Sequence, residues 1–478
     1  MLLSGCAWST IASVDGDGGK ANGQSSEPSV SSDGRYVAFS SYATDLVPDD
    51  NNGQPDIFVR DLRAGITRRV NVDVAGGDAD SSSFEPSISA DGRYVAFTSN
   101  ASDLVEGDGN ARFDVFVRDL VAGTTTRATV DTTGGDPDSG ILDHISLSAN
   151  GRFVAFRSLA ADLVAGDSNA KVDVFVRDLQ AGTTARASVD AAGGDGNDHS
   201  LAPSVSADGR FVVFNSLASD LVAGDTNGRP DVFVRDLQAG MTTKVTTGAF
   251  GVYEGARPEI SADGRFVVFA GTDLEGVFVY DRETGTTALA SVGTPQSSQP
   301  SISADGRFVA YNSYSPELEG PTIYVRDRLS STTASVASSG SYLLSDLAPR
   351  ISGDGRSVAF ADKLDNVIGV GGASVFDVVV RSTTVPTISS VSPSTLVPGS
   401  TATVAVSGTN FLPGASASIT GGVVVSQATR LSDTSLELLV SVPADAAPGL
   451  LLLLVSIPQT GPGPAALSTG VCSCVTIN

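Results

Sequence analysis

The sequence predicts an all-β protein: a seven-bladed β-propeller closed by an N-terminal strand, followed by an immunoglobulin-like (Ig-like) β-sandwich. Three observations support this fold class. One short phrase recurs seven times, a strand-like segment near the N-terminus supplies what the seventh copy lacks, and the composition changes near Pro386. A long repeat built from short strands is typical of a propeller, in which each repeat forms one blade.

The recurring phrase contains an Asp-Gly pair, once Asn-Gly, between two runs of residues that favour strands. In the second copy it reads Pro86-Ser-Ile-Ser-Ala-Asp-Gly-Arg-Tyr-Val-Ala-Phe97, and Val115-Phe-Val-Arg-Asp119 follows it. Successive pairs are between 42 residues (263 to 305) and 59 residues (91 to 150) apart. The pairs begin at Asp33, Asp91, Asn150, Asp208, Asp263, Asp305 and Asp354.

Each copy accounts for four strands. In the second copy, Ile88 and residues 94–97 flank the Asp-Gly pair, which is the signal of a two-residue hairpin and predicts the first two strands. Residues 115–117 are expected to form the third strand, and residues 125–130 the fourth. The middle two strands are apolar at successive positions, so both of their faces should be buried between neighbouring blades.

The N-terminus predicts how the ring closes. Residues 9–15 (Ser-Thr-Ile-Ala-Ser-Val-Asp) match the fourth-strand phrase at 184–190 (Thr-Ala-Arg-Ala-Ser-Val-Asp), but no first three strands precede them. The seventh copy has the opposite deficit, because its third strand ends at Arg381 with no fourth strand after it. We therefore expect residues 9–15 to complete the seventh blade and to remove the open edges of the sheet.

The predicted domains are a residual signal or lipobox-like segment at 1–7, the propeller at 8–382 and the sandwich at 386–478. In the last of these, residues 401–406 and 436–442 alternate as half-buried strands do. The apolar run at 450–455 is far too short to span a bilayer and is expected to be a core strand.

Two resemblances follow from these residues. The phrase at 86–97 with its partner at 115–119 resembles the WD40-like PD40 repeat of the TolB-type propellers, over residues 8–382. This resemblance implies the fold and much less about function. Residues 386–393 (Pro-Thr-Ile-Ser-Ser-Val-Ser-Pro), with Pro398-Gly399 and the Ser-Gly-Thr-Asn-Phe run at 407–411, look like the Ig-like IPT/TIG domain of bacterial surface and secreted proteins, which implies an accessory module.

Composition favours an exported chain that binds neither nucleic acid nor anionic membrane surfaces, because 54 acidic residues face 30 basic ones. Cys6 ends a Leu-Ser-Gly-Cys run that resembles the lipobox of bacterial lipoproteins, so a lipid anchor on Cys6 is the predicted membrane attachment. Cys472 and Cys474 are one residue apart, a spacing that would strain a disulfide, and two unpaired thiols are expected. The chain is expected to be a periplasmic, cell-surface or extracellular monomer.

Four loops between the second and third strands share the pattern Asp-x-Asn-x-x-x-Asp. Two carboxylates and an amide oxygen at alternate turn positions are ligands that calcium accepts, so calcium is the candidate cofactor. The alternative is an Asx-turn, in which Asp and Asn only cap the loop backbone. The candidate metal ligands are Asp50, Asn52, Asp56, Asp108, Asn110, Asp114, Asp167, Asn169, Asp173, Asp225, Asn227 and Asp231.

A second candidate site lies at the entry to the first strand of each repeat, which should surround the mouth of the central channel on the same acidic face. This position is mixed and polar where the strands are uniform, as a central ligand site would require. The alternative is an unconstrained loop end. The seven residues are Glu27, Glu85, His144, Ala202, Arg257, Gln299 and Ala348, and the five polar ones are the candidate ligand contacts.

These patterns predict a non-catalytic binding or scaffold protein that takes an unidentified protein or glycan partner on the acidic loop face. The recurring Arg93, Arg118 and Asp119 are expected to be structural and to form ion pairs between blades. One alternative is a carbohydrate-active enzyme with carboxylates at the channel mouth, which would lose turnover in Glu85→Gln. Another is a TolB-like envelope-assembly factor, although the N-terminal α/β domain and six blades of TolB-type proteins are not matched here.

Overall fold

The structure is a computed structural model that describes residues 9–246, 251–252, 256–272, 276–294, 296–315, 320–338, 348–363, 376–383, 387–409, 411, 415–432, 434–457 and 468–477. Residues 11–380 form one compact unit, and residues 381–478 belong to a second. All elements assigned in the described residues are strands, and no helix there is long and apolar enough to cross a membrane.

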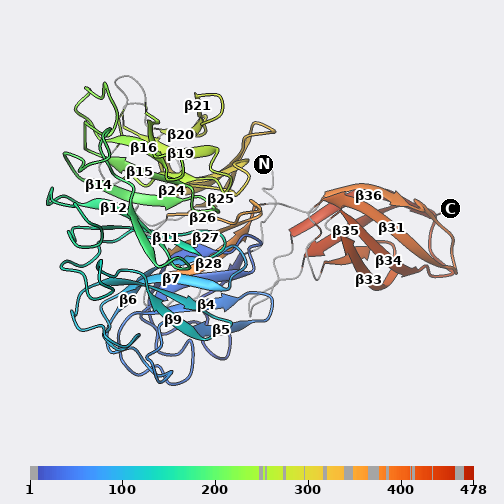
Figure 1. Cartoon of the computed structure of the whole chain (residues 1–478). Coiled ribbons are helices and arrows are strands. Elements are labelled where there is room, and N and C mark those ends of the chain that lie inside the picture. The colour runs from blue at the N-terminus through green and yellow to red at the C-terminus, as the bar shows by residue number, and fades with distance from the viewer. Residues whose placement is uncertain are drawn as a thin grey trace. The chain divides into compact units, whose positions relative to one another are not determined.

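In the described part of the larger unit, the strands form seven four-stranded sheets (Figure 1). The first two sheets are β2 (Ser25–Val30), β3 (Tyr36–Ser41), β4 (Asp56–Asp61), β5 (Ile66–Arg69), and β6 (Ser83–Ile88), β7 (Tyr94–Ser99), β8 (Asp114–Asp119), β9 (Thr124–Arg127). The third and fourth are β10 (Ser146–Leu147), β11 (Phe153–Ser158), β12 (Asp173–Asp178), β13 (Thr183–Arg186), and β14 (Ser200–Val205), β15 (Phe211–Ser216), β16 (Asp231–Asp236), β17 (Met241–Lys244).

The remaining three sheets follow the same order along the chain, except that the N-terminal strand takes the last place in the seventh. The fifth and sixth are β18 (Glu259–Ile260), β19 (Phe266–Gly271), β20 (Gly276–Asp281), β21 (Thr286–Leu289), and β22 (Ser297–Ile302), β23 (Phe308–Ser315), β24 (Gly320–Asp327), β25 (Thr332–Ser338). The seventh is β26 (Arg350–Ile351), β27 (Ser357–Lys363), β28 (Phe376–Ser382), β1 (Ser9–Ile11). This succession of four-stranded sheets is a β-propeller.

The hydrophobic cores of the propeller lie between neighbouring sheets. On β7 and β8, Phe97 pairs with Phe116 and their rings stack with centroids 5.8 Å apart. Both rings are fully buried, in one cluster with Ile57 of the preceding sheet. The middle strands are therefore buried on both faces, as their continuous apolar runs predict.

The N-terminal strand closes the ring as predicted. Just after β1, the backbone N–H of Ala12 donates to the carbonyl of Val378, and the Ser13 hydroxyl donates to Asp377 at 2.8 Å. Ala12 and Val378 are buried in one cluster with Phe39 of the first sheet. Figure 1 shows orange β27 and β28 beside the blue strands of that sheet, so the ends of the repeat array meet.

The glycine of the Asp-Gly pair is required by two constraints at once. Gly92 has a φ of +74°, which only glycine adopts at little cost, and a Cβ there would lie 2.2 Å from the Tyr36 ring of the preceding blade. At the closing blade, Gly34 faces the small Ser357 instead of an aromatic ring. The hairpin turns are thus packed blade against blade around the whole ring.

One expectation about the repeats is wrong. Arg93 and Asp119 form a two-pronged ion pair of 3.0 and 2.6 Å, but both belong to the second sheet, so the pair joins β7 to β8 and not one blade to the next. Arg118 donates to Thr125 of the adjacent strand in the same sheet, at 3.0 Å. Adjacent antiparallel strands bring these side chains together within each repeat, which the sequence spacing alone does not distinguish from a contact between blades.

The smaller unit contains two four-stranded sheets in its described residues. Their strands are β29 (Thr387–Ser392), β31 (Thr401–Thr409), β34 (Ser435–Ser441), β33 (Val424–Ser432), and β30 (Thr395–Leu396), β36 (Ser468–Ile477), β35 (Gly449–Ile457), β32 (Ser416–Ile419). One core is shared by both sheets, with Val440 from the first and Leu453 from the second. Membership of the IPT/TIG class stays a prediction.

One expectation about the smaller unit is confirmed, that of a core strand at 450–455, and another is wrong. The run at 450–455 is a strand, but only alternate residues are buried, with Leu453 at 0% and Leu450 at 65% exposure. Cys472 is disulfide-bonded, so the prediction of a free thiol is wrong at this residue. Cys6 and the partner of Cys472 lie outside the residues whose side chains are described.

Candidate functional site

The entry to the first strand has an unusual backbone in five of the seven blades. In four sheets the pairing of the first two strands shifts register at this point, as between Phe84 and Ser87. A left-handed φ is rare for residues other than glycine, and doubly so before proline. Such conformations persist only where the surrounding fold imposes them, and they cluster at ligand sites. The entry residues that adopt it are Glu27 (54°), Glu85 (53°), His144 (72°), Ala202 (48°) and Gln299 (49°).

Six of the seven predicted entry residues line one cavity of about 470 Å³ at the centre of the ring. This volume is within the range of small-ligand pockets. The exception is Gln299, whose side-chain oxygen accepts from Asn312 at 2.6 Å. The six that line the cavity are Glu27, Glu85, His144, Ala202, Arg257 and Ala348.

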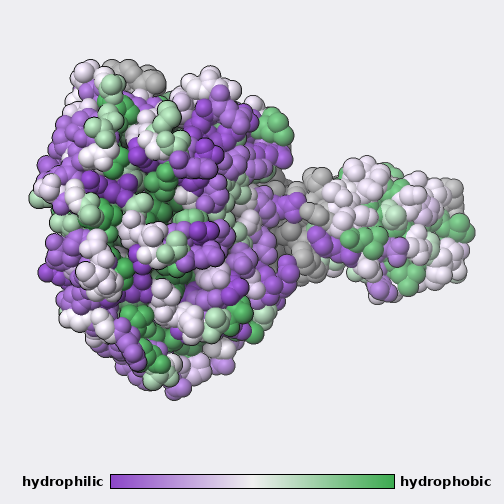
Figure 2. Space-filling view, viewed as in Figure 1, coloured by the Kyte–Doolittle hydropathy of each residue, from purple (hydrophilic) through white to green (hydrophobic). Residues whose placement is uncertain are grey.

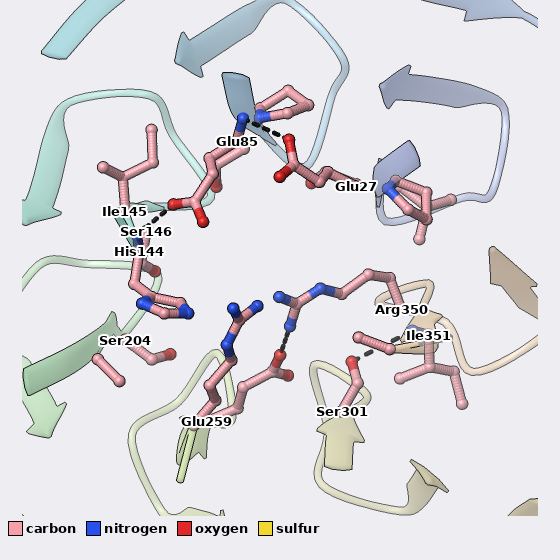
Figure 3. Close-up of a pocket in the computed structure, with 18 of the residues that line it drawn as sticks. Glu27, Glu85, His144, Ile145, Ser146, Ser204, Glu259, Ser301, Arg350 and Ile351 are labelled. Atoms are coloured by element: carbon pink, nitrogen blue, oxygen red, sulfur yellow. Dashed lines mark hydrogen bonds and ion pairs between the residues drawn. The ribbon is translucent and has the colours of Figure 1, made fainter. Parts of the chain in front are cut away.

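A second ring of side chains lies two residues further along each first strand. It was missed by the sequence reasoning, although the signal is visible: five copies have serine here, whereas the fifth has Glu259 and the seventh has Arg350. These two form an ion pair across the cavity, which Figure 3 shows as a dashed line. The serines are Ser29, Ser87, Ser146, Ser204 and Ser301.

Among the described residues, six of the seven positions of the second ring link their blade to the next. The hydroxyl of Ser87 accepts from the backbone N–H of Leu147 at 3.0 Å, and that of Ser301 accepts from Ile351 at 3.2 Å. In the fifth blade the carboxylate of Glu259 replaces the serine hydroxyl and accepts from the backbone N–H of Ile302 in the next blade, at 3.2 Å. Each such bond stabilises the ring by about 1 kcal/mol.

Glu27 and Glu85 form similar links in the first ring. One oxygen of Glu27, Oε2, accepts from the backbone N–H of Glu85 at 2.8 Å and from the hydroxyl of Ser40 at 3.0 Å. In turn, Oε2 of Glu85 accepts from the backbone N–H of His144. Burial, as the largest cause, raises the pKa of Glu27. Figure 3 shows the two carboxylates side by side on one wall of the cavity.

Two nitrogen-bearing side chains of the cavity lack hydrogen bonds. His144 Nδ1 lies 3.2 Å from the Asp143 carboxylate, yet neither ring nitrogen has a hydrogen-bond partner. Burial, helped by the charge of Arg257, lowers the pKa of His144 to about 4, so the imidazole is neutral at pH 7. Within the described part of the chain, no hydrogen bond or ion pair reaches the Arg257 guanidinium. Burial and the neighbouring Arg350 lower its pKa.

Glu85, Asp143 and His144 are close enough to share a metal ion, since one ligand atom from each lies within 4.8 Å of the others. Two of the three are already engaged. Asp143 is ion-paired with Arg157, and Glu85 accepts from a backbone N–H. The donor set of two carboxylates and an imidazole suits a divalent transition metal better than calcium.

The structure brings each predicted calcium set together in its loop and also places a cation there. In the second blade, Nη1 of Arg127 lies 3.3 Å from Asp108 and is ion-paired with Asp136. In the fourth, Nζ of Lys244 lies 2.7 Å from Asp225 and 2.6 Å from Asp231. At the same position, the cation is Arg69 in the first blade and Arg186 in the third.

The asparagine of each loop set serves the backbone. The side-chain oxygen of Asn110 accepts from the N–H of Arg112 at 2.7 Å, and its amide donates to Asp114 at 3.2 Å. The same turn bond forms at Asn52, Asn169 and Asn227. This is the arrangement that the Asx-turn alternative predicts.

The presence of a cation in these loops could also have been inferred from the sequence. The four repeats with the Asp-x-Asn-x-x-x-Asp loop end their fourth strand with Arg69, Arg127, Arg186 or Lys244, whereas the fifth and sixth repeats lack the loop and have Leu289 and Ser335 at the paired position. Residues that vary together are commonly in contact. Burial raises the pKa of Asp56 and Asp114 to about 6 despite their partners.

Comparison with known proteins shows the fold alone. No protein-family model and no curated protein matches the sequence. The structure is similar to an oligogalacturonate lyase from Vibrio parahaemolyticus, with a TM-score of 0.51, 13% identity and coverage of 79% of this chain and 97% of that one. The structure is equally similar to an oligogalacturonate lyase in complex with manganese, with a TM-score of 0.51, 13% identity and coverage of 79% of this chain and 98% of that one. TolB from Acinetobacter baumannii is also among the similar structures, at a TM-score of 0.38, 13% identity and coverage of 69% and 76%.

Proposed function

We propose that this protein is an exported, non-catalytic binding or scaffold protein, built from a seven-bladed propeller and an Ig-like IPT/TIG module. It takes a protein or glycan partner on the loop face, and the channel mouth is the pocket that receives a group of that partner. The observation that carries the proposal is the cavity of about 470 Å³, lined by His144, whose two buried ring nitrogens have no hydrogen-bond partner, and by Arg257, which forms no ion pair among the described residues. Buried polar groups are normally satisfied, so such groups in a cavity indicate a ligand.

The engaged carboxylates support binding over catalysis. Glu27 and Glu85 each commit an oxygen to a backbone N–H of the next blade, where it fixes the ring. These carboxylates therefore have a structural role in the ring that does not depend on any reaction. The surface of the propeller visible in Figure 2 is mostly hydrophilic, which suits a polar partner.

The geometry of the four loops changes where we propose that a metal binds. Calcium has an internal substitute in all four loops, since each contains an arginine or lysine among its carboxylates. A similar propeller is described in complex with manganese. We therefore place a divalent metal, if the chain takes one, on Glu85, Asp143 and His144 and not in the loops.

The test is capture of a partner from panels of glycans and peptides by the full chain. Ala348→Trp, which fills the cavity from its wall, should abolish capture, and Val121→Trp at an exposed turn residue is the matched control. Capture that survives Ala348→Trp would overturn the channel mouth as the site. Turnover of a captured glycan, lost in Glu85→Gln, would show a carbohydrate-active enzyme instead.

A further inference from the structure

The walls of the cavity carry opposite charges on opposite sides. Glu27 and Glu85 come from the first two blades, whereas Arg257 and Arg350 come from the fifth and seventh. Figure 3 shows Glu27 and Glu85 along one wall, His144 on a second, and Arg350 reaching in from the side opposite His144. A ligand that fits must therefore present an acceptor or a negative charge at one end and hydrogen-bond donors at the other.

On the positive side there is a place for one negative charge. Arg350 and Glu259 neutralise one another in an ion pair. Arg257 has no such partner within the described residues, although Glu27, Glu85 and Glu259 act on it from a distance. A guanidinium offers a planar fork of donors that matches a carboxylate. A dianion such as a phosphate ester would bring a second charge toward the three glutamates.

On the negative side of the cavity, several side-chain atoms can accept hydrogen bonds from a ligand. In their hydrogen bonds to described residues, Glu27 and Glu85 use only Oε2, so Oε1 of each remains available to a ligand. His144 adds an imidazole without a hydrogen bond on either nitrogen. A peptide carboxyl terminus carries one nearby N–H, whereas a sugar ring carries several hydroxyls in different directions. The cavity volume of about 470 Å³ suits a single sugar ring.

Building on the proposed function, we propose that the group received at the channel mouth is an acidic sugar, a uronic acid residue of a glycan. Its carboxylate lies between Arg257 and Arg350, and its hydroxyls donate to Glu27 and Glu85. Arg257 then determines specificity for the acid over the neutral sugar, because it contributes the cation that forms no ion pair among the described residues.

The experiment is calorimetric titration of the full chain with D-glucuronate and with D-glucose, which has a hydroxymethyl group in place of the carboxylate. Glucuronate should bind at least tenfold more tightly. Arg257→Gln should remove this preference, since it deletes the charge while keeping a polar, though shorter, side chain. Arg93→Gln, which breaks an ion pair within one blade, is the control that should leave the preference intact.

Each other outcome overturns the inference in a distinguishable way. Equal binding of glucose, or a preference that survives Arg257→Gln, would show that the carboxylate is not recognised while leaving the channel mouth as a binding site. Tighter binding of N-acetyl-L-alanine than of glucuronate, with its amide as control, would identify a peptide carboxylate instead. If no sugar binds but capture of another partner is still lost in Ala348→Trp, the proposed function stands without this ligand.

Discussion

The four acidic loops and the channel mouth are both rich in charge, and they differ in how completely that charge is paired. In the second-blade loop, Asp108 and Asp136 share Arg127, and the asparagine of the set caps its own backbone. At the channel mouth, Arg257 forms no ion pair within the described residues, whereas the cation of each loop forms at least one. Internal pairing indicates a structural role, whereas incomplete pairing in a cavity indicates a ligand.

The largest expected effect tests the loop cation. Arg127→Gln should destabilise the propeller by about 3 kcal/mol, because it leaves buried carboxylates without their cation. The side chains of Arg127 and Asp108 are 8% and 3% exposed, so solvent screens them little. Chemical denaturation measures the loss.

Two variants make this test specific. Arg127→Lys should recover most of the stability, because the fourth blade already uses Lys244 at the same position. Arg93→Gln, at a 42% exposed arginine, should cost much less, because solvent screens an exposed ion pair. An Arg127→Gln loss as small as that of Arg93→Gln would mean that the loop cations are not structural.

The stability contributed by the two regions should change with pH in opposite directions. The pKa of Asp56 and of Asp114 is raised to about 6 from 3.8, so their contribution to stability is complete below pH 3.8 and is lost as pH rises through 6. His144 acts in the opposite direction, because its pKa of about 4 lies below 6.5, and stability is lost as pH falls from 6.5 to 4.

Lowering the pH from 7.5 to 5 should therefore stabilise the protein through the aspartates by about 1 kcal/mol each, partly offset by His144. Thermal unfolding at the two pH values measures the net effect. His144→Gln should enlarge the rise, and Asp114→Asn should reduce it. A melting temperature that falls at pH 5 in both the wild type and His144→Gln would contradict the raised aspartate pKa values.

Removing the channel-mouth cation should have little effect on stability. Arg257→Gln is expected to change the free energy of unfolding by less than about 0.5 kcal/mol, because no hydrogen bond or ion pair within the described residues is lost. Ligand sites commonly retain such unfavourable groups for function. Destabilisation as large as that of Arg127→Gln would show that the arginine is structural and would remove the contrast between the two regions.

Calcium should have the smallest effect of all. Millimolar calcium after EDTA treatment is expected to leave the wild-type melting temperature unchanged, because each loop already contains a cation, whereas a metal bound only by the folded state would raise it. Magnesium serves as the control. A calcium-specific rise that disappears when Asp108, Asn110 and Asp114 and the corresponding residues of the other three loops are replaced by Ala would restore the loops as metal sites.

Much of the fold could be predicted because each blade is encoded locally. The Asp-Gly hairpins and the doubly apolar strands repeat within short spans, and the match between residues 9–15 and 184–190 was enough to predict closure through β1. The Arg93–Asp119 pair was recognised as structural but assigned between blades, because a repeat places the same residues in every blade and does not tell a neighbour within the sheet from one beyond it.

The channel mouth could be predicted only in part. The entry position was found because Glu27, Glu85 and His144 vary where the repeat is otherwise uniform. Glu259 and Arg350 were missed even though they replace a recurrent serine, since charge at a strand position has no assigned direction until the blades are placed around the channel.

The sequence by itself determined the repeat, the blade strands and the positions where repeats differ, because these depend on residues close together along the chain. Only the tertiary structure decided which charges are paired. Arg127 and Asp108 are brought together by strand pairing, and Glu259 meets Arg350 across the ring, 91 residues away in the chain. Electrostatic pairing depends on distances of a few ångströms between such residues, and those distances exist only once the ring has closed.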